Sequence, residues 1–261
     1  MPAELIAEYI RRFWGYGRWE RPVWFLGMEE GMLKGDNGAG PVSLPVRLDN
    51  WRNRGSRELE NAPEFCHRLD LRRFFPPPGD HPPRHAPQRT WDNLIKVYLA
   101  AKFNREATNA EVRAFRSREF GRDEEGVKAF TLIELFPLPS PDTGAWSYGP
   151  LAEQLPYLIN RDTYRHTVFS ARAATLRQKL ATYKPVAVLC YSKIYRELFE
   201  GVIGQRFPTQ IDALGVARIV LGTTQIFLCD HVVAVGTRNA RLTAIGQYIQ
   251  NCLTPSQRNL L

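Results

Sequence analysis

Short apolar runs alternate with amphipathic stretches along most of this chain. The apolar runs lie at residues 23–26, 130–136, 186–190, 217–221 and 226–229, and their lengths are those of buried strands. The amphipathic stretches predict helices over 3–14, 46–54, 62–73, 90–103, 108–120, 167–183, 192–199 and 240–252, with a short helical segment over 150–159. Evenly apolar strands between helices predict an α/β fold, a three-layer α/β/α sandwich around a mostly parallel central sheet.

The chain has no internal repeat and no obvious linker between these elements. We therefore expect a single domain over residues 1–261, a length that suffices for one large core. Glycine and proline interrupt the pattern at 32–45, which predicts a loop. Six prolines exclude a helix or a central strand from 74–88. We interpret 74–88 as a surface crossing, and an arm over DNA or over a substrate is the alternative.

The chain carries 35 Lys and Arg against 27 Asp and Glu, which gives a net charge of +8. This balance favours a polyanionic partner, and nucleic acid is the first candidate, although many basic proteins bind no polyanion. No apolar run approaches the ~20 residues that span a bilayer, and the N-terminal stretch lacks the apolar core of a signal peptide. We expect a soluble, cytoplasmic protein without a membrane partner.

The four cysteines give no sign of a metal centre or of a disulfide framework. Cys66, Cys190, Cys229 and Cys252 form no CxxC pair, so neither a zinc ribbon nor an iron–sulfur site is supported. The chain also lacks a GxGxxG or P-loop pattern, which argues against a nucleotide cofactor. We therefore predict no metal and no cofactor.

Polar or reactive side chains follow four of the predicted strands. These groups are Glu29 and Glu30 between Gly27 and Gly31, then Glu134, then Tyr191 and Ser192, and finally Asp230 and His231. Parallel strands end at one edge of a sheet, so the groups are expected to converge there. Glu29 and His231 facing each other across a crevice are an acid–base or electrostatic pair. The alternative is that these are ordinary strand ends with solvated side chains, and that His231 is structural.

The first and last of these strand ends resemble two motifs of the uracil-DNA glycosylase superfamily. Residues 27–31, Gly-Met-Glu-Glu-Gly after an apolar strand, resemble its first motif. Asp230 and His231, with the loop 232–241 and a closing helix over 242–249, resemble its second motif.

Two intervening segments extend the resemblance. The run 184–189, followed by Tyr191 and Ser192, is similar to the third strand of the superfamily and the helix start after it. Residues 130–139 are similar to the strand whose end reads the base. The four pieces occur in order over most of the chain, and together they imply the activity of a DNA glycosylase.

The sequence departs from the superfamily pattern at four positions. Glu29 stands where family members have Asp, Asn or a neighbouring Glu. Glu30 stands where most members have proline, and Val232 follows His231 where the motif normally continues with proline and serine. Glu134 stands where an asparagine usually reads the edge of uracil. An ionised carboxylate only accepts hydrogen bonds and repels O4 of uracil. Glu134 is therefore protonated, or turns away into the structure, or the base is not uracil but one with an exocyclic amine.

The resemblance implies roles for several residues. Glu29 is the candidate for the sugar side of the breaking bond and His231 for the base side. The implied substrate-binding residues are Gly27, Met28, Glu30, Gly31, Glu134, Phe136 and Ser192. The loop 232–241 offers apolar residues for a wedge and Arg238 and Arg241 for DNA phosphates. Trp51, Phe136 and Tyr191 are candidates for an aromatic platform. DNA is the expected partner and a monomer the expected state.

Three other interpretations remain open from the sequence. One is a nucleic-acid-binding module on the same fold that has lost catalysis, which the unusual motif residues support. Another is a metal-dependent nuclease or phosphohydrolase with Glu29, Glu30, Asp36 and Glu134 as ligands. A third is a small-molecule enzyme of the doubly wound type.

Overall fold

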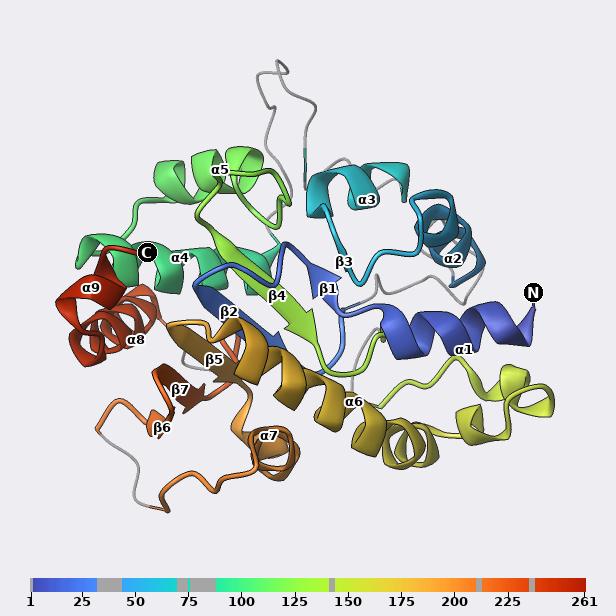
Figure 1. The fold of residues 1–261 in the computed structure, drawn as a ribbon. Helices are drawn as coiled ribbons and strands as arrows, with labels where there is room; N and C mark the ends of the chain where they lie inside the picture. Colours follow the sequence, from blue (N-terminus) through green and yellow to red (C-terminus); the bar gives the residue numbers. More distant parts are fainter. Residues whose placement is uncertain are drawn as a thin grey trace.

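The structure is a computed structural model in which residues 2–31, 44–69, 75, 88–140, 144–209, 213–234 and 238–261 are described. Its centre is a seven-stranded sheet in the order β3-β1-β4-β2-β5-β7-β6 (Figure 1). The strands are β1 Gly15–Tyr16, β2 Val23–Gly27, β3 Leu59–Glu60, β4 Phe130–Glu134, β5 Ala187–Tyr191, β6 Ala217–Leu221 and β7 Thr224–Cys229. The four central strands β4, β2, β5 and β7 run parallel, while β1 is antiparallel to β4 and β6 to β7.

Helices flank this sheet and complete a three-layer α/β/α fold, which confirms the predicted class (Figure 1). The α-helices are α1 Ala3–Arg12, α2 Leu44–Asn53, α3 Ala62–Arg68, α4 Arg89–Phe103, α5 Asn109–Arg118, α6 Arg161–Tyr183, α7 Arg196–Ile203, α8 Asn239–Cys252 and α9 Pro255–Arg258. Three short 3-10 helices are η1 Gly149–Glu153, η2 Pro156–Leu158 and η3 Lys193–Tyr195. In the described part of the chain, no helix is both long and apolar enough to cross a membrane.

Neighbouring residues of β2 show how the sheet is buried on both faces. The ring of Trp24 lies 6.5 Å from that of Tyr183 at the end of α6. The next residue, Phe25, points to the other face, where its ring meets Phe130 at 4.6 Å. Phe130 in turn contacts Tyr98 of α4 at 5.3 Å. Because successive side chains of a strand point to opposite faces, α6 covers one side of the sheet and α4 the other.

Helices α4 and α8 pack closely against each other where they cross. A Cβ added at Gly246 would lie 2.4 Å from the carbonyl oxygen of Val97 and 2.6 Å from Cβ of Ala100. Only a glycine allows this approach. The close packing fixes α4, whose first turn faces the carboxyl ends of the strands.

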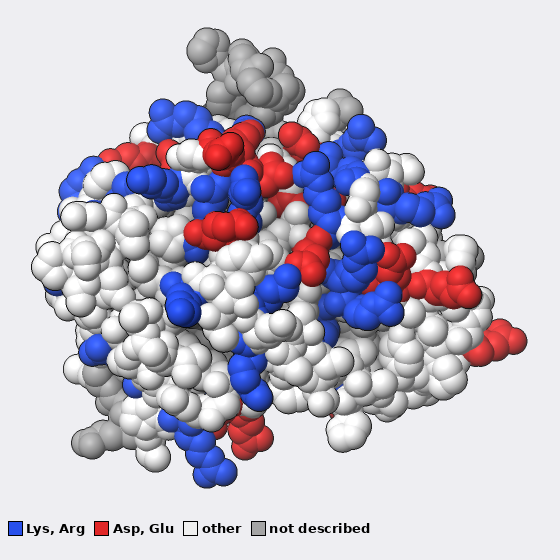
Figure 2. Space-filling view, in the orientation of Figure 1, with Lys and Arg blue, Asp and Glu red and all other residues white. Residues whose placement is uncertain are grey.

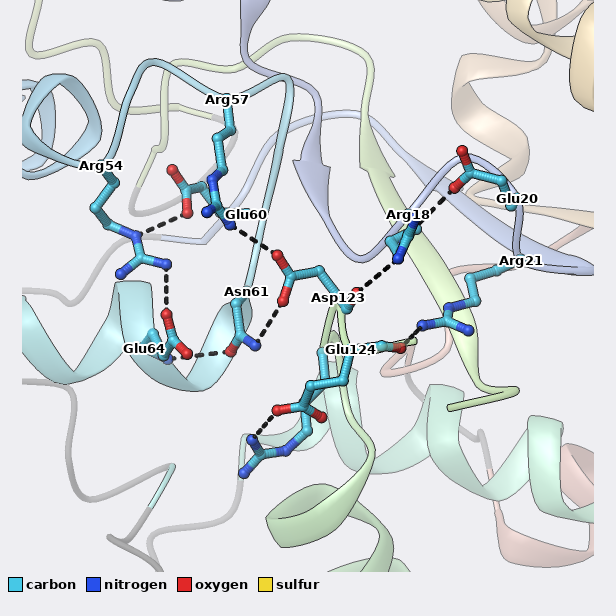
Figure 3. Close-up of polar contacts among 11 residues, drawn as sticks. Arg18, Glu20, Arg21, Arg54, Arg57, Glu60, Asn61, Glu64, Asp123 and Glu124 are labelled. Atoms are coloured by element: carbon cyan, nitrogen blue, oxygen red, sulfur yellow. Dashed lines mark hydrogen bonds and ion pairs between the residues drawn. The ribbon is translucent and has the colours of Figure 1, made fainter. Parts of the chain in front are cut away.

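A polar network lies near the amino-terminal ends of β2 and β4, in the segments just before these strands begin (Figure 3). Asp123 accepts hydrogen bonds from Arg57 at 2.7 Å and from Asn61 at 3.0 Å. Arg21 donates to the carbonyl oxygen of Glu124 at 2.6 Å. These contacts connect the short strand β3 and α3 to the turn before β4. The network lies away from the carboxyl ends of the parallel strands, where a ligand site is expected.

Several predicted boundaries differ from the observed ones. Helix α6 begins at Arg161 rather than at residue 167, because the Asn160 side chain accepts a hydrogen bond from the backbone of Thr163 and caps the helix there. Ser192, the predicted cap of the next helix, makes no side-chain capping bond. The two-residue strands β1 and β3 were not predicted. The predicted loop 32–45 is wrong at its end, because Leu44 and Pro45 already belong to α2. The rest of that loop, most of 74–88 and the end of the predicted helix 62–73 lie outside the described residues.

Candidate functional site

A cavity of about 390 Å³ opens where the parallel strands end. It is lined by residues at or just after the ends of β2, β4, β5 and β7, together with the first turn of α4, one residue of α6 and η3. The described lining is Met28, Glu29, Glu30, Gly31, Gln88, Thr90, Trp91, Glu134, Ser140, Arg165, Tyr191, Ser192, Ile194, Tyr195 and His231. Glu29 and His231 therefore face the same hollow, as the order of the strands predicts.

Two arginines of α6 hold Glu29. Arg165 donates from Nε at 2.9 Å and from Nη2 at 2.7 Å, and both bonds go to Oε1 of Glu29. Arg161, one helical turn earlier, places Nε 3.5 Å from Oε2. The two guanidinium groups hold the Glu29 carboxylate by charge and hydrogen bonding.

Glu30 belongs to a buried ion pair. Its Oε2 accepts hydrogen bonds from Nη1 of Arg47 and from the hydroxyl of Tyr16, both at 2.8 Å. The Arg47 side chain is 2% exposed and that of Glu30 is 7% exposed. Removal of either partner would leave a buried charge uncompensated, so this pair is a structural support of the cavity wall.

Glu134 lies on the wall of the cavity with one oxygen unpartnered. Its Oε1 is 3.4 Å from the hydroxyl of Tyr191, and its Oε2 is buried without a hydrogen-bond partner among the described residues. Burial raises the pKa of Glu134 well above its ordinary value, and the nearby carboxylates of Glu30 and Glu29 act in the same direction. Burial therefore favours the neutral, protonated form of the Glu134 carboxyl.

His231 follows the end of β7, which is two strands away from β2 in the sheet. Burial lowers the pKa of its imidazole below the ordinary value. Its Nδ1 accepts a hydrogen bond from the backbone N–H of Val233 at 3.3 Å, which assigns the proton to Nε2. The imidazole also meets the ring of Tyr191 edge-on at 5.8 Å. His231 is thus a hydrogen-bond donor rather than a cation at neutral pH.

The structure adds wall residues that the sequence did not single out. Trp91 and Tyr195 line the cavity as aromatic groups, and Arg165 lies between the rings of Tyr195 at 5.1 Å and Phe136 at 5.5 Å. Ile194 lines the mouth with 78% of its surface exposed. Helical spacing from a cap at Asn160 is the sequence signal for Arg165, whereas Trp91 and Ile194 have no local signal.

Of the other predicted site residues, some line the cavity and some do not. Met28, Gly31 and Ser192 line the cavity, and so does the platform candidate Tyr191. Gly27 lies beneath it, because a Cβ at that position would be 2.2 Å from the Tyr191 hydroxyl. Phe136 is buried behind Arg165 and is not a lining residue. Trp51, another platform candidate, instead packs against Tyr9 in the core, at 5.1 Å between rings.

The arginines predicted to bind DNA phosphates do not line the cavity. Arg241 donates to Asp230 at 2.5 Å, and the side chain of Arg238 is exposed just before α8. Figure 2 shows basic and acidic side chains interleaved over the upper part of the face it displays. Part of the loop 232–241 lies outside the described residues.

The described residues include no group of three or more His, Cys, Asp or Glu arranged to hold a metal ion. Glu29 and Glu30 each face a guanidinium instead. Asp36, the fourth ligand in the nuclease interpretation, lies outside the described residues.

No family model matches the chain, and no curated protein has a matching sequence.

Proposed function

We propose that this chain is a DNA glycosylase of the uracil-DNA glycosylase type. It hydrolyses the N-glycosidic bond of a flipped-out uracil, or of another deaminated or damaged base in DNA. The observation that carries the proposal is the unpartnered Oε2 of Glu134 in a cavity that Glu29 and His231 also line. The metal-dependent alternative has no comparable support, because arginines engage two of its four acidic residues.

A neutral Glu134 would not repel O4 of uracil, as an ionised carboxylate would. When the Tyr191 hydroxyl donates to Oε1, the acid proton resides on Oε2. The protonated carboxyl can then donate a hydrogen bond, as an amide N–H would. The fitting ligand atom is a carbonyl oxygen, such as O4 of uracil or O6 of hypoxanthine. A carboxylic acid kept neutral by burial is a known device for hydrogen-bonding a developing oxyanion.

The reaction needs charge stabilisation at two places. The bond between C1′ and the base nitrogen breaks, and its electron pair leaves with the base. Water oxygen bonds to C1′, and its released proton balances the charge of the departing base. The products are a free base and an abasic sugar with a hydroxyl at C1′. Positive charge develops on the sugar and negative charge on the base oxygens.

Glu29 and His231 suit these two places. The carboxylate of Glu29 stabilises the sugar cation and orients water, and its two arginines keep it in one geometry. His231 donates from Nε2 to a base oxygen and stays neutral while it does so. Preorganised groups of this kind are each worth ~10² or more in rate.

DNA as the partner is supported by the net charge of +8 and by the need to extrude the base. The apolar side chain of Ile194 at the mouth is the best-exposed candidate for filling the space that a flipped base leaves.

The test is base release from labelled oligonucleotides that carry uracil, hypoxanthine, xanthine or an alkylated base. Alkali cleaves the abasic product, and parallel reactions with a chelator identify any metal dependence. We expect Glu29→Gln and His231→Ala each to slow release ~100-fold while DNA binding is largely kept. Glu153→Gln, an exposed carboxylate outside the cavity, is the matched control.

Three results would count against the proposal. Full activity in both site variants would remove the assigned residues. Activity that disappears with chelator would favour the nuclease. Tight DNA binding by the wild-type protein without release of any base would favour an inactive binding module on the same fold.

A further inference from the structure

We infer that Arg165 is the positioning residue for Glu29, so that one carboxylate oxygen is fixed by the protein and the other serves the reaction. This inference rests on the proposed function, because it assigns a role within the same site. No motif of the sequence identifies Arg165. Its placement follows from the start of α6, which the hydrophobic pattern put six residues too late.

The contacts on the two oxygens of Glu29 are unequal. Oε1 receives both hydrogen bonds from Arg165, at 2.7 and 2.9 Å. Oε2 receives no hydrogen bond within the described part of the chain and lies 3.5 Å from Nε of Arg161. Two donors of a planar guanidinium on one oxygen fix the torsion of the carboxylate. Oε2 is then the oxygen available to a water or to the sugar.

Arg165 is itself held on both sides. Its guanidinium lies over the rings of Phe136 and Tyr195, at 5.5 and 5.1 Å from their centroids. Cation–π contacts of this kind fix the plane of an arginine. Arg161 is anchored separately, since it donates to Ala145 at 2.5 Å and lies over the ring of Trp146. The two arginines are four residues apart and so share one face of α6.

This arrangement explains why a carboxylate at the end of a strand does not turn toward solvent. A displacement of about 1 Å in a reacting group costs ~10²-fold in rate. The effect of Arg165 should therefore appear in the chemical step rather than in DNA binding. A guanidinium that instead contacted a DNA phosphate would change affinity and its salt dependence.

The experiment is chemical rescue of Arg165→Ala. We expect kcat to fall ~10- to 100-fold with KM within about twofold of the wild type. Guanidinium chloride at low millimolar concentration should restore part of kcat by occupying the slot between the two rings. Arg165→Lys should keep an intermediate rate. Arg177→Ala, on the exposed part of the same helix, should neither lose activity nor respond to guanidinium.

A second measurement makes the inference independent of catalysis. Urea midpoints of Glu29→Gln, Arg165→Ala and the double variant form a cycle, and a non-additive result is expected for a coupled pair. Additive midpoints would overturn the inference whatever the activity. A rise in KM with a weaker salt dependence would overturn it as well, because Arg165 would then bind phosphate.

The two proposals fail in different ways. If Glu29→Gln retains full base release, the proposed function loses its site, whereas the urea cycle still decides the pairing. If Glu29→Gln is impaired but Arg165→Ala is not, the glycosylase stands and the positioning role falls.

Discussion

The hydroxyl of Tyr191 lies 3.4 Å from Oε1 of Glu134, and both groups sit directly above the Cα of Gly27. The three residues come from neighbouring parallel strands: Glu134 from β4, Gly27 from β2 and Tyr191 from β5. Gly27 and Tyr191 surround the buried carboxyl of Glu134 on the cavity wall. The Tyr191 hydroxyl donates to Oε1, while Oε2 lies buried beside Gly27 without a hydrogen-bond partner among the described residues. Glu134 works as a donor only while it remains protonated.

The protonation of Glu134 predicts how stability depends on pH. Its pKa is raised in the folded state from a model-peptide value of 4.5, so above that pH the unfolded chain has lost a proton that the folded protein retains. The stabilising contribution is present in full below pH 4.5 and is lost as the pH rises toward the folded pKa. The slope is at most about 1.4 kcal/mol per pH unit.

Glu134→Gln removes this titration while it keeps the shape of the protonated acid. We expect the free energy of unfolding of the variant, measured with urea, to increase relative to that of the wild type as the pH is raised from 5 to 7. Glu153→Gln, an exposed control, should follow the wild type. A constant difference between Glu134→Gln and the wild type across this range would mean that Glu134 is ionised in the folded protein.

Gly27→Ala tests the contact beneath the acid. The new Cβ would lie 2.2 Å from the Tyr191 hydroxyl and 2.8 Å from Oε2 of Glu134, so both side chains must move. We expect about 1–3 kcal/mol of destabilisation, from denaturant unfolding, and a loss of base release. Gly149→Ala is the control, because its nearest contact would be an ordinary 3.6 Å. Equal stability in the two variants would show that Glu134 and Tyr191 do not pack as described.

The sequence predicts the central sheet well for a physical reason. Strands that are buried on both faces are apolar at nearly every position, as in β2 and β5, so a short apolar run suffices to locate them. Strands β1 and β3 have only two residues each, which is too short for any periodicity. The start of α6 was misplaced because Tyr164 is the only apolar residue within 161–166, and the other buried residue of that stretch is Arg161.

The residues of the candidate site likewise fall into those that the sequence predicts and those that it does not. Glu29, Glu134 and His231 are predictable because parallel topology alone brings strand ends together. Arg165 and Trp91 reach the cavity from helices whose position depends on tertiary packing, which a single sequence does not encode locally. The ion pair between Glu30 and Arg47 is of the same kind, since its partners come from different elements.

Arg172 forms no ion pair with the described residues, yet we expect its removal to have a large effect on stability. Its guanidinium lies 3.6 Å from the centroid of the Trp14 ring and donates to the carbonyl oxygens of Ile10, Arg11, Phe13, Glu134 and Leu135. Burial lowers its pKa to about 10, so it is still protonated at pH 7. Arg172→Met leaves these carbonyls without a donor, and we expect a loss of roughly 3 kcal/mol or more in urea unfolding.

The control for this variant is Arg177→Met on the same helix. Arg177 is exposed and donates to the carbonyl oxygens of Val202 and Gly201, so its loss should cost well under half as much. Similar losses for both variants would mean that the carbonyls around Arg172 are satisfied in another way.

Ile194 predicts a difference between duplex and single-stranded DNA. The side chain stands at the mouth of the cavity with 78% of its surface exposed, so it is accessible to an apolar partner. A base stack opened by flipping is such a partner. We expect Ile194→Ser to slow base release from a duplex ~10-fold and to reduce the fluorescence rise of a 2-aminopurine placed beside the target base.

Single-stranded substrate separates this role from a general defect, because it has little stacking to replace. Release from a single strand should be unchanged in Ile194→Ser. Ile159→Ser is the matched control, since Ile159 is 57% exposed but does not line the cavity. An equal loss on both substrates would place Ile194 in contact with the base itself, and no loss on either would leave the wedge to the loop 232–241.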